Sequence, residues 1–505
     1  MSKLILCIHP KNIITRDEYN YALPIWGKKS FHTPLPLLTV AAIIPPQYEV
    51  KLIDLNIQEV SDDDLLNANM VFTTSMLVQK VSIDTILKRC FELNVISVLG
   101  GPYATSYEGE IKYATCLVKG EAEDILSKLF IDYENDELKK IYQGDSVDLT
   151  KSPCPRFDLI ESDNYQCALL QYSRGCPYKC DFCDIPWLYG KTQRAKTISQ
   201  FVKELETLYQ TGFRGWVELA DSNFFTNKQT KELLSEVIRW QKDKNYPFVF
   251  RCQASVNMAQ KNKVLDLMIA ANFRMVLVGV ETPVMGSLQE MNKFQNTGLN
   301  LLECIDKIQK KGLQVDIGAI VGFDNDPTDI FEIQKNFVSK SKVIISGLGL
   351  LGVLNHTPLY DRMMKENRLL FQSSVDRIEL NFEPKMDKKI LLKGFVNLYQ
   401  WLYDPKNYFN RCEAFLKAYN AGYVKPSYWQ GINIFVKACF EIMPDKYVYH
   451  YIIFVVKVLF TNPKKLLRAI DLGILGYHYY KIADDIAKRT TLRAKERRKS
   501  EASSL

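Results

Sequence analysis

The chain has 505 residues, of which 24% are charged and 47% hydrophobic, so we expect two or three globular domains rather than a largely disordered protein. Its formal net charge of +7 is modest for this length, and the basic run near the C-terminus lacks a nucleic-acid-binding motif, so no nucleic-acid partner is expected. The apolar run before Pro10 is too short for a signal peptide, and the 12 cysteines are too sparse for a disulfide scaffold. Both observations predict a cytoplasmic protein with reduced thiols.

The first part of the chain, about residues 1–135, alternates between short β-branched runs and helical stretches. The predicted strands are 3–10, 48–55, 70–75, 95–102 and 115–123, and the predicted helices between them include 35–44 and 79–94. This alternation predicts a doubly wound parallel sheet. A polar stretch with Pro153 and Pro155 follows, and we interpret residues 136–165 as a linker.

Ligands of a doubly wound sheet bind outside the carboxyl ends of its strands. We therefore nominate the residues that end the predicted strands, which are mostly small or polar: Thr73, Thr74, Ser75, Gly100, Gly101, Pro102, Gly120 and Glu121. The same residue types also end strands through turn chemistry alone. No GxGxxG motif follows the first strand, which argues against NAD or FAD as the ligand.

A second alternating region covers about residues 166–375. Its strand-like runs are 167–175, 215–224, 248–257, 274–282, 313–323 and 345–354. Six βα units predict a full or partial parallel barrel, whose chemistry lies at the carboxyl ends of the strands. The polar side chains at these ends include Asp221, Asn223, Gln253, Ser255, Asn257 and Glu281. Each one alone is compatible with a helix cap or a turn, but their shared position indicates a site.

The loop after the first of these strands contains Cys176, Cys180 and Cys183 in a CxxxCxxC spacing. A structural zinc site needs a fourth ligand, and no cysteine or histidine lies close enough in sequence to supply it. A [4Fe–4S] cluster held by three thiolates keeps one iron open for a substrate or a second cofactor. The spacing and the strand-end position therefore favour a catalytic cluster over a zinc site or structural thiols.

This cysteine loop resembles the signature of radical S-adenosylmethionine (SAM) enzymes, including the aromatic Phe182 before the third cysteine. The resemblance implies that SAM chelates the open iron. It also implies that one electron from the cluster cleaves SAM to a radical, which abstracts hydrogen from an unactivated carbon. The motifs LADSNF, RCQASVN, VGVET and GAIVGF look like the SAM-binding elements of that family. They nominate as SAM contacts Asp221, Asn223, Gln253, Ser255, Glu281, Gly318, Ile320 and Gly322.

The order of an open α/β domain, a radical SAM barrel and a helical C-terminal region resembles the cobalamin-binding radical SAM enzymes. Segments such as PLPLLTVAAIIP, LGGP, KGEAED, KFQN and IVGFDNDP are similar to the subgroup that contains hopanoid C-2 methylases, over about residues 1–420. The resemblance implies a Rossmann-like (flavodoxin-like), cobalamin-binding-type domain at 1–135, a partial (β/α)6 TIM-type barrel at 166–375 and a helical domain at 376–505. Cobalamin would lie between the sheet and the barrel. No histidine would bind the cobalt from below, because the chain has DLN at 54–56 and no DxHxxG motif.

Three positions depart from the pattern of that subgroup. Asp221 is followed by Ser222 instead of a second acid, and Gln253 takes the place of an expected Glu. The turn after the sixth strand is NHTPLY (355–360) rather than a PGTPLY-like sequence. SAM binding remains compatible with these changes, whereas the identity of the substrate is put in doubt.

Residues 376–505 change to a helical and aromatic pattern, with helical spacing at 387–403, 431–443 and 447–460. The run 447–460 is too short to span a membrane and contains Lys457, so we interpret it as a buried or interfacial helix. Between Lys488 and Lys499 there are seven Lys or Arg and one acid. These features favour contact with an anionic membrane surface or, equally, a solvated tail on a helical cap.

The sequence thus predicts a cobalamin-dependent radical SAM methyltransferase with a [4Fe–4S] cluster, SAM and cobalamin as cofactors. Its predicted substrate is an unactivated carbon of a lipid or terpenoid, and its implied electron donor is of the flavodoxin or ferredoxin type. Two alternatives stay open. One is radical chemistry on the same architecture that forms rings or C–C bonds without methyl transfer, and the other is a non-catalytic iron–sulfur or corrinoid sensor.

Overall fold

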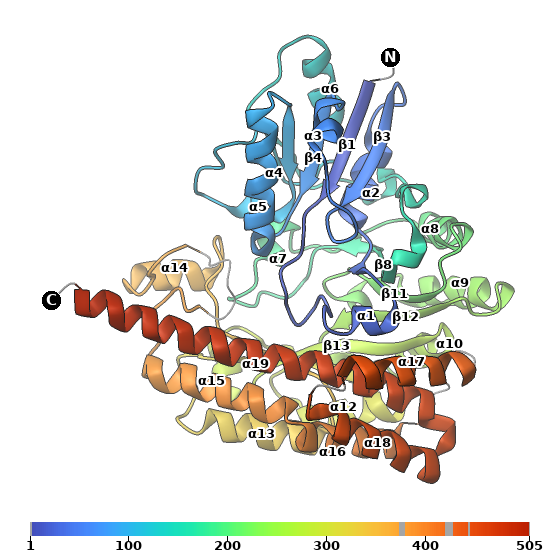
Figure 1. Cartoon of the computed structure of the whole chain (residues 1–505), viewed down its shortest axis with the longest axis vertical. Coiled ribbons are helices and arrows are strands. Elements are labelled where there is room, and N and C mark those ends of the chain that lie inside the picture. The colour runs from blue at the N-terminus through green and yellow to red at the C-terminus, as the bar shows by residue number, and fades with distance from the viewer. Residues whose placement is uncertain (1–2, 373–378, 420–427, 443–444, 504–505) are drawn as a thin grey trace.

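The computed structural model of the chain describes residues 3–372, 379–419, 428–442 and 445–503. It contains two parallel sheets and a group of C-terminal helices. Figure 1 shows the N-terminal α/β unit at the top, the second sheet in the middle and the C-terminal helices at the bottom. The predicted fold class is confirmed.

The N-terminal sheet has six parallel strands in the order β3-β1-β4-β5-β6-β7. The strands are β1 (Lys3–His9), β3 (Tyr48–Asp54), β4 (Met70–Thr74), β5 (Ser97–Gly100), β6 (Cys116–Lys119) and β7 (Ile141–Gln143). The helices are α2 (Leu35–Ile43), α3 (Asp62–Leu66), α4 (Lys80–Glu92), α5 (Gly101–Ser106) and α6 (Leu126–Glu134). Successive side chains of β1 point to opposite faces, so Leu6 and Ile8 join one apolar core while Ile5 and Cys7 join another. Both faces are buried, which explains why these strands read as continuous apolar runs.

The second sheet has seven parallel strands in the order β15-β14-β13-β12-β11-β8-β2 and forms a half-barrel. Six of its strands are the six predicted ones: β8 (Tyr165–Leu170), β11 (Gly215–Leu219), β12 (Phe248–Ala254), β13 (Phe273–Glu281), β14 (Gln314–Val321) and β15 (Ser346–Leu350). The connecting helices are α8 (Ile198–Gln210), α9 (Thr230–Asp243), α10 (Asn262–Ala270), α11 (Met285–Glu290), α12 (Leu301–Lys310), α13 (Ile330–Ser341) and α14 (Pro358–Lys365). A short helix, α7 (Ile185–Leu188), and two short paired strands, β9 (Ser173–Arg174) and β10 (Arg194–Ala195), follow β8.

The seventh strand, β2 (Ser30–His32), comes from the range that the sequence assigned to the N-terminal domain. It pairs in parallel with β8 and so extends the half-barrel at one edge. The segment before it, which includes α1 (Leu23–Trp26), reaches the other edge, where Arg16 Nη1 donates to the Leu348 carbonyl of β15 at 3.3 Å. An early segment of the chain therefore crosses the open side of the half-barrel.

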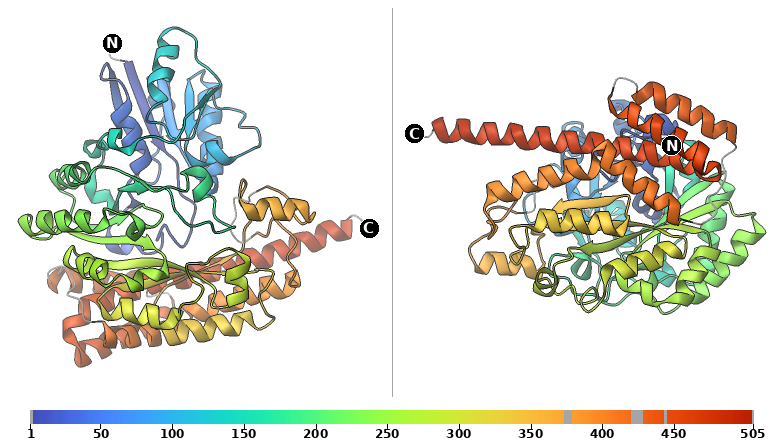
Figure 2. Two further views of the ribbon diagram at one scale, coloured as in Figure 1. Left: turned by 180° about the vertical axis from the view of Figure 1, so that it is seen from behind. Right: turned by 90° about the horizontal axis from the view of Figure 1, so that it is seen from below.

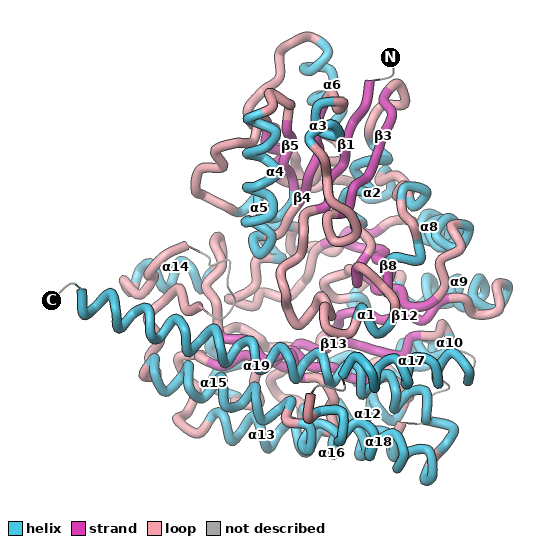
Figure 3. The backbone as a smooth tube through the Cα atoms, in the orientation of Figure 1, coloured by secondary structure: helices cyan, strands magenta, loops and turns pink. Residues whose placement is uncertain are grey.

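The C-terminal helices complete this closure. They are α15 (Lys388–Tyr403), α16 (Pro405–Ala418), α17 (Tyr428–Ile442), α18 (Tyr447–Thr461) and α19 (Leu466–Ser503). His478 of α19 hydrogen-bonds the Arg16 carbonyl through Nε2 at 3.1 Å, and the Tyr21 hydroxyl donates to Asp485 at 2.6 Å. Figure 2 shows α19 running along the half-barrel and extending beyond it, and Figure 3 shows α15 to α19 gathered on one side of the sheet.

No helix among the described residues is long and apolar enough to cross a membrane. The predicted run 447–460 forms α18, which has one buried and one exposed face. The backbone of α19 continues through the basic segment, but its side chains from residue 492 onward lie outside the described part of the chain. The expectation for the basic tail therefore stays a prediction.

Candidate active site

The three cysteines of the CxxxCxxC motif lie together on the loop between β9 and α7. Cys180 is buried, while Cys176 and Cys183 are partly exposed. Burial raises the pKa of Cys176 and raises that of Cys183 to about 12, and in both cases a negative charge on Cys180 adds to the effect. The thiols of Cys176 and Cys183 therefore keep their protons until a metal cation compensates the thiolate charge. A set of three neighbouring thiols fits an iron–sulfur cluster with one open iron.

The loop is closed by tight backbone contacts. Gly175 has φ +93°, and a Cβ at this position would lie 2.6 Å from the Thr192 carbonyl oxygen. The Cys176 amide donates to the Gly190 carbonyl at 3.2 Å. Only glycine accepts this left-handed conformation and this close approach at no steric cost, so Gly175 fixes the entry into the cysteine loop.

Asp221, at the end of β11, supports the base of this loop. Its fully buried carboxylate accepts hydrogen bonds from the amides of Tyr172 at 2.9 Å and Ser173 at 2.6 Å, and from the Ser173 hydroxyl. Burial raises the pKa of Asp221 to about 6, although these hydrogen bonds oppose the shift. The sequence nominated Asp221 as a SAM contact, and the structure places its oxygens against the chain that leads into the cysteines.

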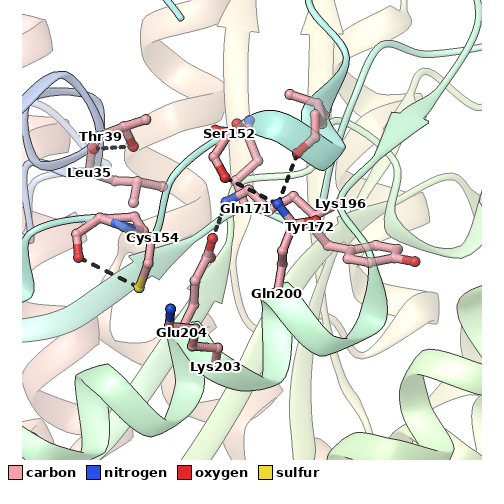
Figure 4. Close-up of polar contacts among 12 residues, drawn as sticks. Leu35, Thr39, Ser152, Cys154, Gln171, Tyr172, Lys196, Gln200, Lys203 and Glu204 are labelled. Atoms are coloured by element: carbon pink, nitrogen blue, oxygen red, sulfur yellow. Dashed lines mark hydrogen bonds and ion pairs between the residues drawn. The ribbon is translucent and has the colours of Figure 1, made fainter. Parts of the chain in front are cut away.

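The linker and α8 pack against the same strand end. Gln200 of α8 donates to the carbonyls of Thr150 at 2.9 Å and Ser152 at 3.1 Å. The Lys196 amide donates to the Tyr172 carbonyl at 2.9 Å, and its ammonium forms a buried ion pair with Glu204. Figure 4 shows Ser152, Gln200, Lys196 and Glu204 in this arrangement. The linker is thus attached to the element that positions the cysteine loop.

A chain of polar side chains joins β11 and β12 to the cysteine loop. Asn223 Nδ2 donates to Ser255 Oγ at 3.0 Å, Ser255 Oγ donates to Asn257 Oδ1 at 2.8 Å, and Asn257 Nδ2 donates to the Tyr178 hydroxyl at 2.8 Å. Asn223 also lowers the pKa of Cys176 through a hydrogen bond, against the larger effect of burial. The structure therefore brings the predicted Asn223 and Ser255 together, whereas the predicted Gln253 has an exposed side chain at the end of β12.

Glu281 ends β13 in a left-handed backbone conformation, with φ +63°, which is unusual for a non-glycine residue. Its carboxylate pairs with the buried Lys293 ammonium at 2.7 Å. The pair is accommodated by two glycines, since a Cβ at Gly279 would lie 2.5 Å from Glu281 Oε1 and one at Gly318 would lie 3.6 Å from Oε2. Gly318, predicted to contact SAM, thus faces the predicted Glu281.

The two remaining predicted residues are Ile320 at the end of β14 and Gly322 just after it. Ile320 is partly exposed, and Gly322 has φ +106° where the chain turns to donate its amide to Asp326 at 2.8 Å. A Cβ at Gly322 would lie 3.2 Å from Leu391 of α15. Gly322 therefore allows a turn and a close helix contact.

Sequence reasoning did not nominate two residues of the KFQN segment that reach the cysteine loop. Gln295 Nε2 donates to Cys180 Sγ at 3.3 Å, and Lys293 Nζ lies 5.7 Å from the Phe182 ring centroid. Although burial opposes its charge, Glu281 and Cys180 raise the pKa of Lys293. The KFQN run contributes only to the family resemblance, because nothing in its composition points to the cysteines.

The carboxyl edge of the N-terminal sheet holds the other predicted residues. The hydroxyl oxygens of Thr73 and Ser75, at the end of β4, are buried and have no hydrogen-bond partner among the described residues. Gly101 starts α5 with φ +87°, and a Cβ there would lie 2.3 Å from Thr74 Oγ1. Gly100 precedes it at the end of β5. Unsatisfied hydroxyls next to a bare glycine backbone, beside the β1/β4 switch point of the sheet, fit a polar cofactor such as a corrinoid.

Glu121 and Gly120 have a different environment. The Glu121 carboxylate pairs with Arg174 at 2.8 Å and with Arg194, and both arginines come from the strands that flank the cysteine loop. Glu123 pairs with the same Arg174 at 2.6 Å. The predicted Glu121 is thus engaged in joining the two domains, and the two arginines are site-organising residues that the sequence did not reveal. Gly120 has φ +81°, and a Cβ there would lie 2.1 Å from the Gly144 carbonyl oxygen, so both the conformation and the close approach require glycine.

A pocket of about 430 Å³ lies where these two domains meet. The N-terminal unit contributes Gly120 and Gln143, and α7 contributes Trp187 and Leu188. His356, which adopts φ +62°, stacks on Trp187 with ring centroids 3.9 Å apart. The histidine of the divergent NHTPLY turn therefore forms part of this interdomain wall.

A second group of potential metal ligands lies inside the half-barrel. His32, Cys167 and Glu218 have ligand atoms within 4.8 Å of one another. Arg251 already binds Glu218 at 2.9 Å, and His32 lies 3.0 Å from the same oxygen. Although burial opposes it, hydrogen bonds to Cys167 and Glu218 raise the pKa of His32 to about 10. A protonated imidazole has no lone pair for a metal, so this group is an ion-pair network.

Two family models match the chain. The model of the radical SAM superfamily matches residues 170–335, and a domain of unknown function (DUF4070) matches residues 357–491. The first range covers the strands β11 to β14 and the cysteine loop.

Two relatives are similar over most of their length. An uncharacterized methyltransferase of Synechocystis sp. is 36% identical over 82% of this chain and 78% of the relative. The hopanoid C-2 methylase of Rhodopseudomonas palustris is 33% identical over 74% of this chain and 73% of the methylase.

Two solved structures share the fold. The cobalamin-dependent SAM radical enzyme OxsB, with aqua-cobalamin and SAM bound, has a TM-score of 0.59 and 14% identity over 98% of this chain and 81% of its own. The radical SAM methyltransferase TsrM of Kitasatospora setae has a TM-score of 0.55 and 16% identity over 72% of this chain and 75% of its own.

Proposed function

The chain belongs to the radical SAM family and has its B12-binding-like architecture, and from this premise we propose that it methylates an unactivated carbon of a lipid such as a polycyclic terpenoid. The observation that supports this is that the carboxyl edges of the two sheets, each with candidate cofactor-binding residues, meet at one interface. The three thiols lie on a loop flanked by Arg174 and Arg194, which form ion pairs with Glu121 at the edge of the N-terminal sheet. At the same edge, the buried hydroxyls of Thr73 and Ser75 lack partners among the described residues. Two cofactor sites that share one interface suit a transfer between cofactors.

The residues of this chain would have the following roles in binding the cofactors. Cys176, Cys180 and Cys183 would hold the cluster, and Gln295 would donate a hydrogen bond to one of its sulfur ligands. Asn223, Ser255 and Glu281, with the β14 glycines, would orient SAM at the barrel mouth. When bound, these groups supply reductive cleavage of SAM and a carrier for the methyl group.

The edge of the N-terminal sheet would hold the corrinoid. Thr73 and Ser75 would donate hydrogen bonds to its polar side groups, and Gly100 and Gly101 would let it approach the backbone. The ion pairs of Glu121 with Arg174 and Arg194 would hold this edge at a fixed position relative to the cysteine loop. The stacked Trp187 and His356 would form one wall of the pocket at this interface.

The lipid substrate is supported by the 33% identity to a hopanoid C-2 methylase and by the exposed face of α18. Six of its large apolar side chains are more than a third exposed: Tyr449, Ile452, Ile453, Val456, Leu459 and Phe460. Phe460 is 82% exposed, and α18 contains no acidic residue. Contiguous exposed apolar faces are typical of interaction sites. Lys446 and Lys464, near the two ends of α18, would suit contact with anionic lipid. We therefore propose peripheral membrane association through α18.

The methylation proposal is tested with lipid extracts and with the purified protein. Cells that carry the gene should contain a lipid one methyl heavier than the lipid of cells without it. Anaerobically reconstituted protein should take up cobalamin in addition to the cluster. Iron–sulfur absorption without corrinoid uptake would favour the ring-forming alternative, and absence of SAM cleavage under a strong chemical reductant would favour the sensor.

The membrane proposal is tested by sedimentation with vesicles of phosphatidylglycerol and phosphatidylcholine. Wild-type protein should sediment with them, and Phe460→Asp should reduce the bound fraction severalfold. Phe91→Asp is the matched control, because Phe91 is 62% exposed on the N-terminal α4. Equal loss in both variants would contradict a role for α18.

A further inference from the structure

A second pocket, of about 450 Å³, lies on the outside of the barrel mouth next to the cysteine loop. Pro177 and Tyr178, which stand between the first two cysteines of the motif, form one of its walls. Asn257 forms another and donates to the Tyr178 hydroxyl at 2.8 Å. The pocket therefore lies directly against the segment that would hold a cluster, and none of the predicted SAM contacts lines it.

Three lysines line this pocket: Lys228 and Lys231 after β11, and Lys261 after β12. All three are exposed, and we name them the lysine patch. Lys179 within the cysteine motif and Lys263 on α10 are exposed close by in sequence. Over residues 177–179, 225–232 and 257–264 there are five lysines and a single acid, Glu232.

The lysine patch forms no ion pair with any residue that the structure describes. Two half-buried lysines of the barrel are paired, Lys311 with Asp266 at 2.5 Å and Lys335 with Glu332 at 2.7 Å. Among the described residues, no carboxylate lies within 4.0 Å of the ammonium groups of the lysine patch, or of Lys179 and Lys263. An uncompensated cationic cluster produces a local positive potential, which attracts an anionic partner and accelerates its association.

The position of the patch indicates what the partner does. A cluster on this loop must receive one electron for each SAM that it cleaves, and the chain contains no second motif that resembles a redox centre. The electron must therefore come from another molecule, which has to approach the cysteine loop closely. The pocket wall formed by Pro177 and Tyr178 is part of that loop and is open to solvent.

We propose that the lysine patch is the docking surface for an acidic one-electron carrier protein, which reduces the cluster through the Pro177–Tyr178 side of the cysteine loop. The carrier is oxidised by one electron and the cluster is reduced by one, and no proton or bond is exchanged in this step. The proposal rests on the proposed function only in needing a cluster at the three cysteines.

The test compares a protein donor with a small reductant. The reconstituted full-length protein is mixed anaerobically with a reduced, acidic flavodoxin as the probe, and cluster reduction is followed by its visible absorption. The triple variant Lys228→Glu, Lys231→Glu and Lys261→Glu should lower the second-order rate at least tenfold, whereas Lys→Arg at the same positions should retain it. With dithionite, which needs no docking surface, both variants should be reduced like the wild type and should cleave SAM.

A charge-matched control separates the effect of the lysine patch on the reduction rate from the effect of the protein's net charge. Lys112, Lys389 and Lys406 are exposed lysines elsewhere in the chain, and their triple change to Glu should leave the flavodoxin rate within twofold. The wild-type rate should fall steeply with added salt, and that of the patch variant should not.

Two results would overturn the proposal: a patch variant that flavodoxin reduces at the wild-type rate, or a wild-type rate that does not depend on salt. Neither result resembles failure of the proposed function, in which dithionite itself would produce no SAM cleavage in the wild type.

Discussion

The carboxyl edges of the two parallel sheets meet at the cysteine loop, but their polar groups are arranged differently. At the barrel edge, Asp221 and Asn223 have their polar atoms bonded to neighbouring protein groups. At the edge of the N-terminal sheet, Thr73 and Ser75 keep buried hydroxyls without a partner. The barrel edge is therefore organised before any ligand binds, whereas the other edge still has hydrogen-bonding capacity for one.

The difference has a physical cause. A loop that must hold three thiols at fixed positions needs a rigid base, so its supporting carboxylate and amides bond to the backbone. A surface that receives a large polar cofactor keeps hydroxyls free to donate to it. Glu121 departs from this division, since it lies on the N-terminal edge and binds two arginines of the barrel.

The largest effect should come from removing a thiol. We expect Cys180→Ala to abolish iron–sulfur absorption and 5′-deoxyadenosine formation in anaerobically reconstituted protein, because two thiolates do not replace three. Cys304→Ala, which removes a partly exposed cysteine of α12, is the control and should change neither signal. A Cys180→Ala protein with a full cluster would show that the barrel edge is not the metal site.

Breaking the connection between the two edges should have the next largest effect. Glu121→Gln leaves Arg174 and Arg194 largely buried without that carboxylate, and removal of one member of a buried ion pair costs about 3–5 kcal/mol. Thermal unfolding should shift to lower temperature, and limited proteolysis should cut the 136–165 linker faster. Asp306→Asn, in the exposed pair with Lys310, should change both measurements little. Equal behaviour of the two variants would contradict the role of Glu121 in joining the domains.

The rigid base of the cysteine loop should show a pH signature. Burial raises the folded-state pKa of Asp221 to about 6 from 3.8, so between these values the folded protein holds a proton that the unfolded chain has lost. The Asp221 contribution to the free energy of unfolding is therefore fully present below pH 3.8 and falls as pH rises to about 6, by up to about 3 kcal/mol. Asn cannot titrate, so the stability of wild type relative to Asp221→Asn should fall between pH 4 and 6.5. Thermal unfolding of the apo-protein at several pH values checks this, and a constant difference would refute it.

The smallest effect should come from changing a hydroxyl without a partner at the carboxyl edge of the N-terminal sheet. Thr73→Val keeps the shape of the side chain and removes a buried hydroxyl without a partner, so the apo-protein should gain about 1 kcal/mol in the free energy of unfolding. The same change should weaken cobalamin binding several-fold, measured by absorption titration. Thr85→Val, at a hydroxyl bonded within α4 at 3.0 Å, is the control and should leave cobalamin binding unchanged. Unaltered affinity in Thr73→Val would place the corrinoid elsewhere.

Much of the fold could be predicted because it depends on local patterns. Five of the six strands of the N-terminal sheet and the six βα units of the barrel were recognised from short β-branched runs, which are continuous because both faces of the strands are buried. The sixth strand, β7, was not, because its three residues lie in the polar range 136–165 that the sequence assigned to a linker. The strand β2 was not predicted, since three residues carry no periodic signal and their pairing with β8 depends on a contact 135 residues away along the chain. The closure of the half-barrel by Arg16 and His478 could not be predicted for the same reason.

The amino-acid sequence alone determined the cysteine motif, the succession of the three structural parts and the family to which the chain belongs, because these depend on residue types at fixed spacings. Only the tertiary structure decided how the nominated polar residues are used. Asp221 supports the loop, Glu121 joins the domains, and Gln295 reaches a thiol from a segment with no local signal. The lysine patch likewise exists only in three dimensions, because its residues follow two different strands and meet where those strands end side by side.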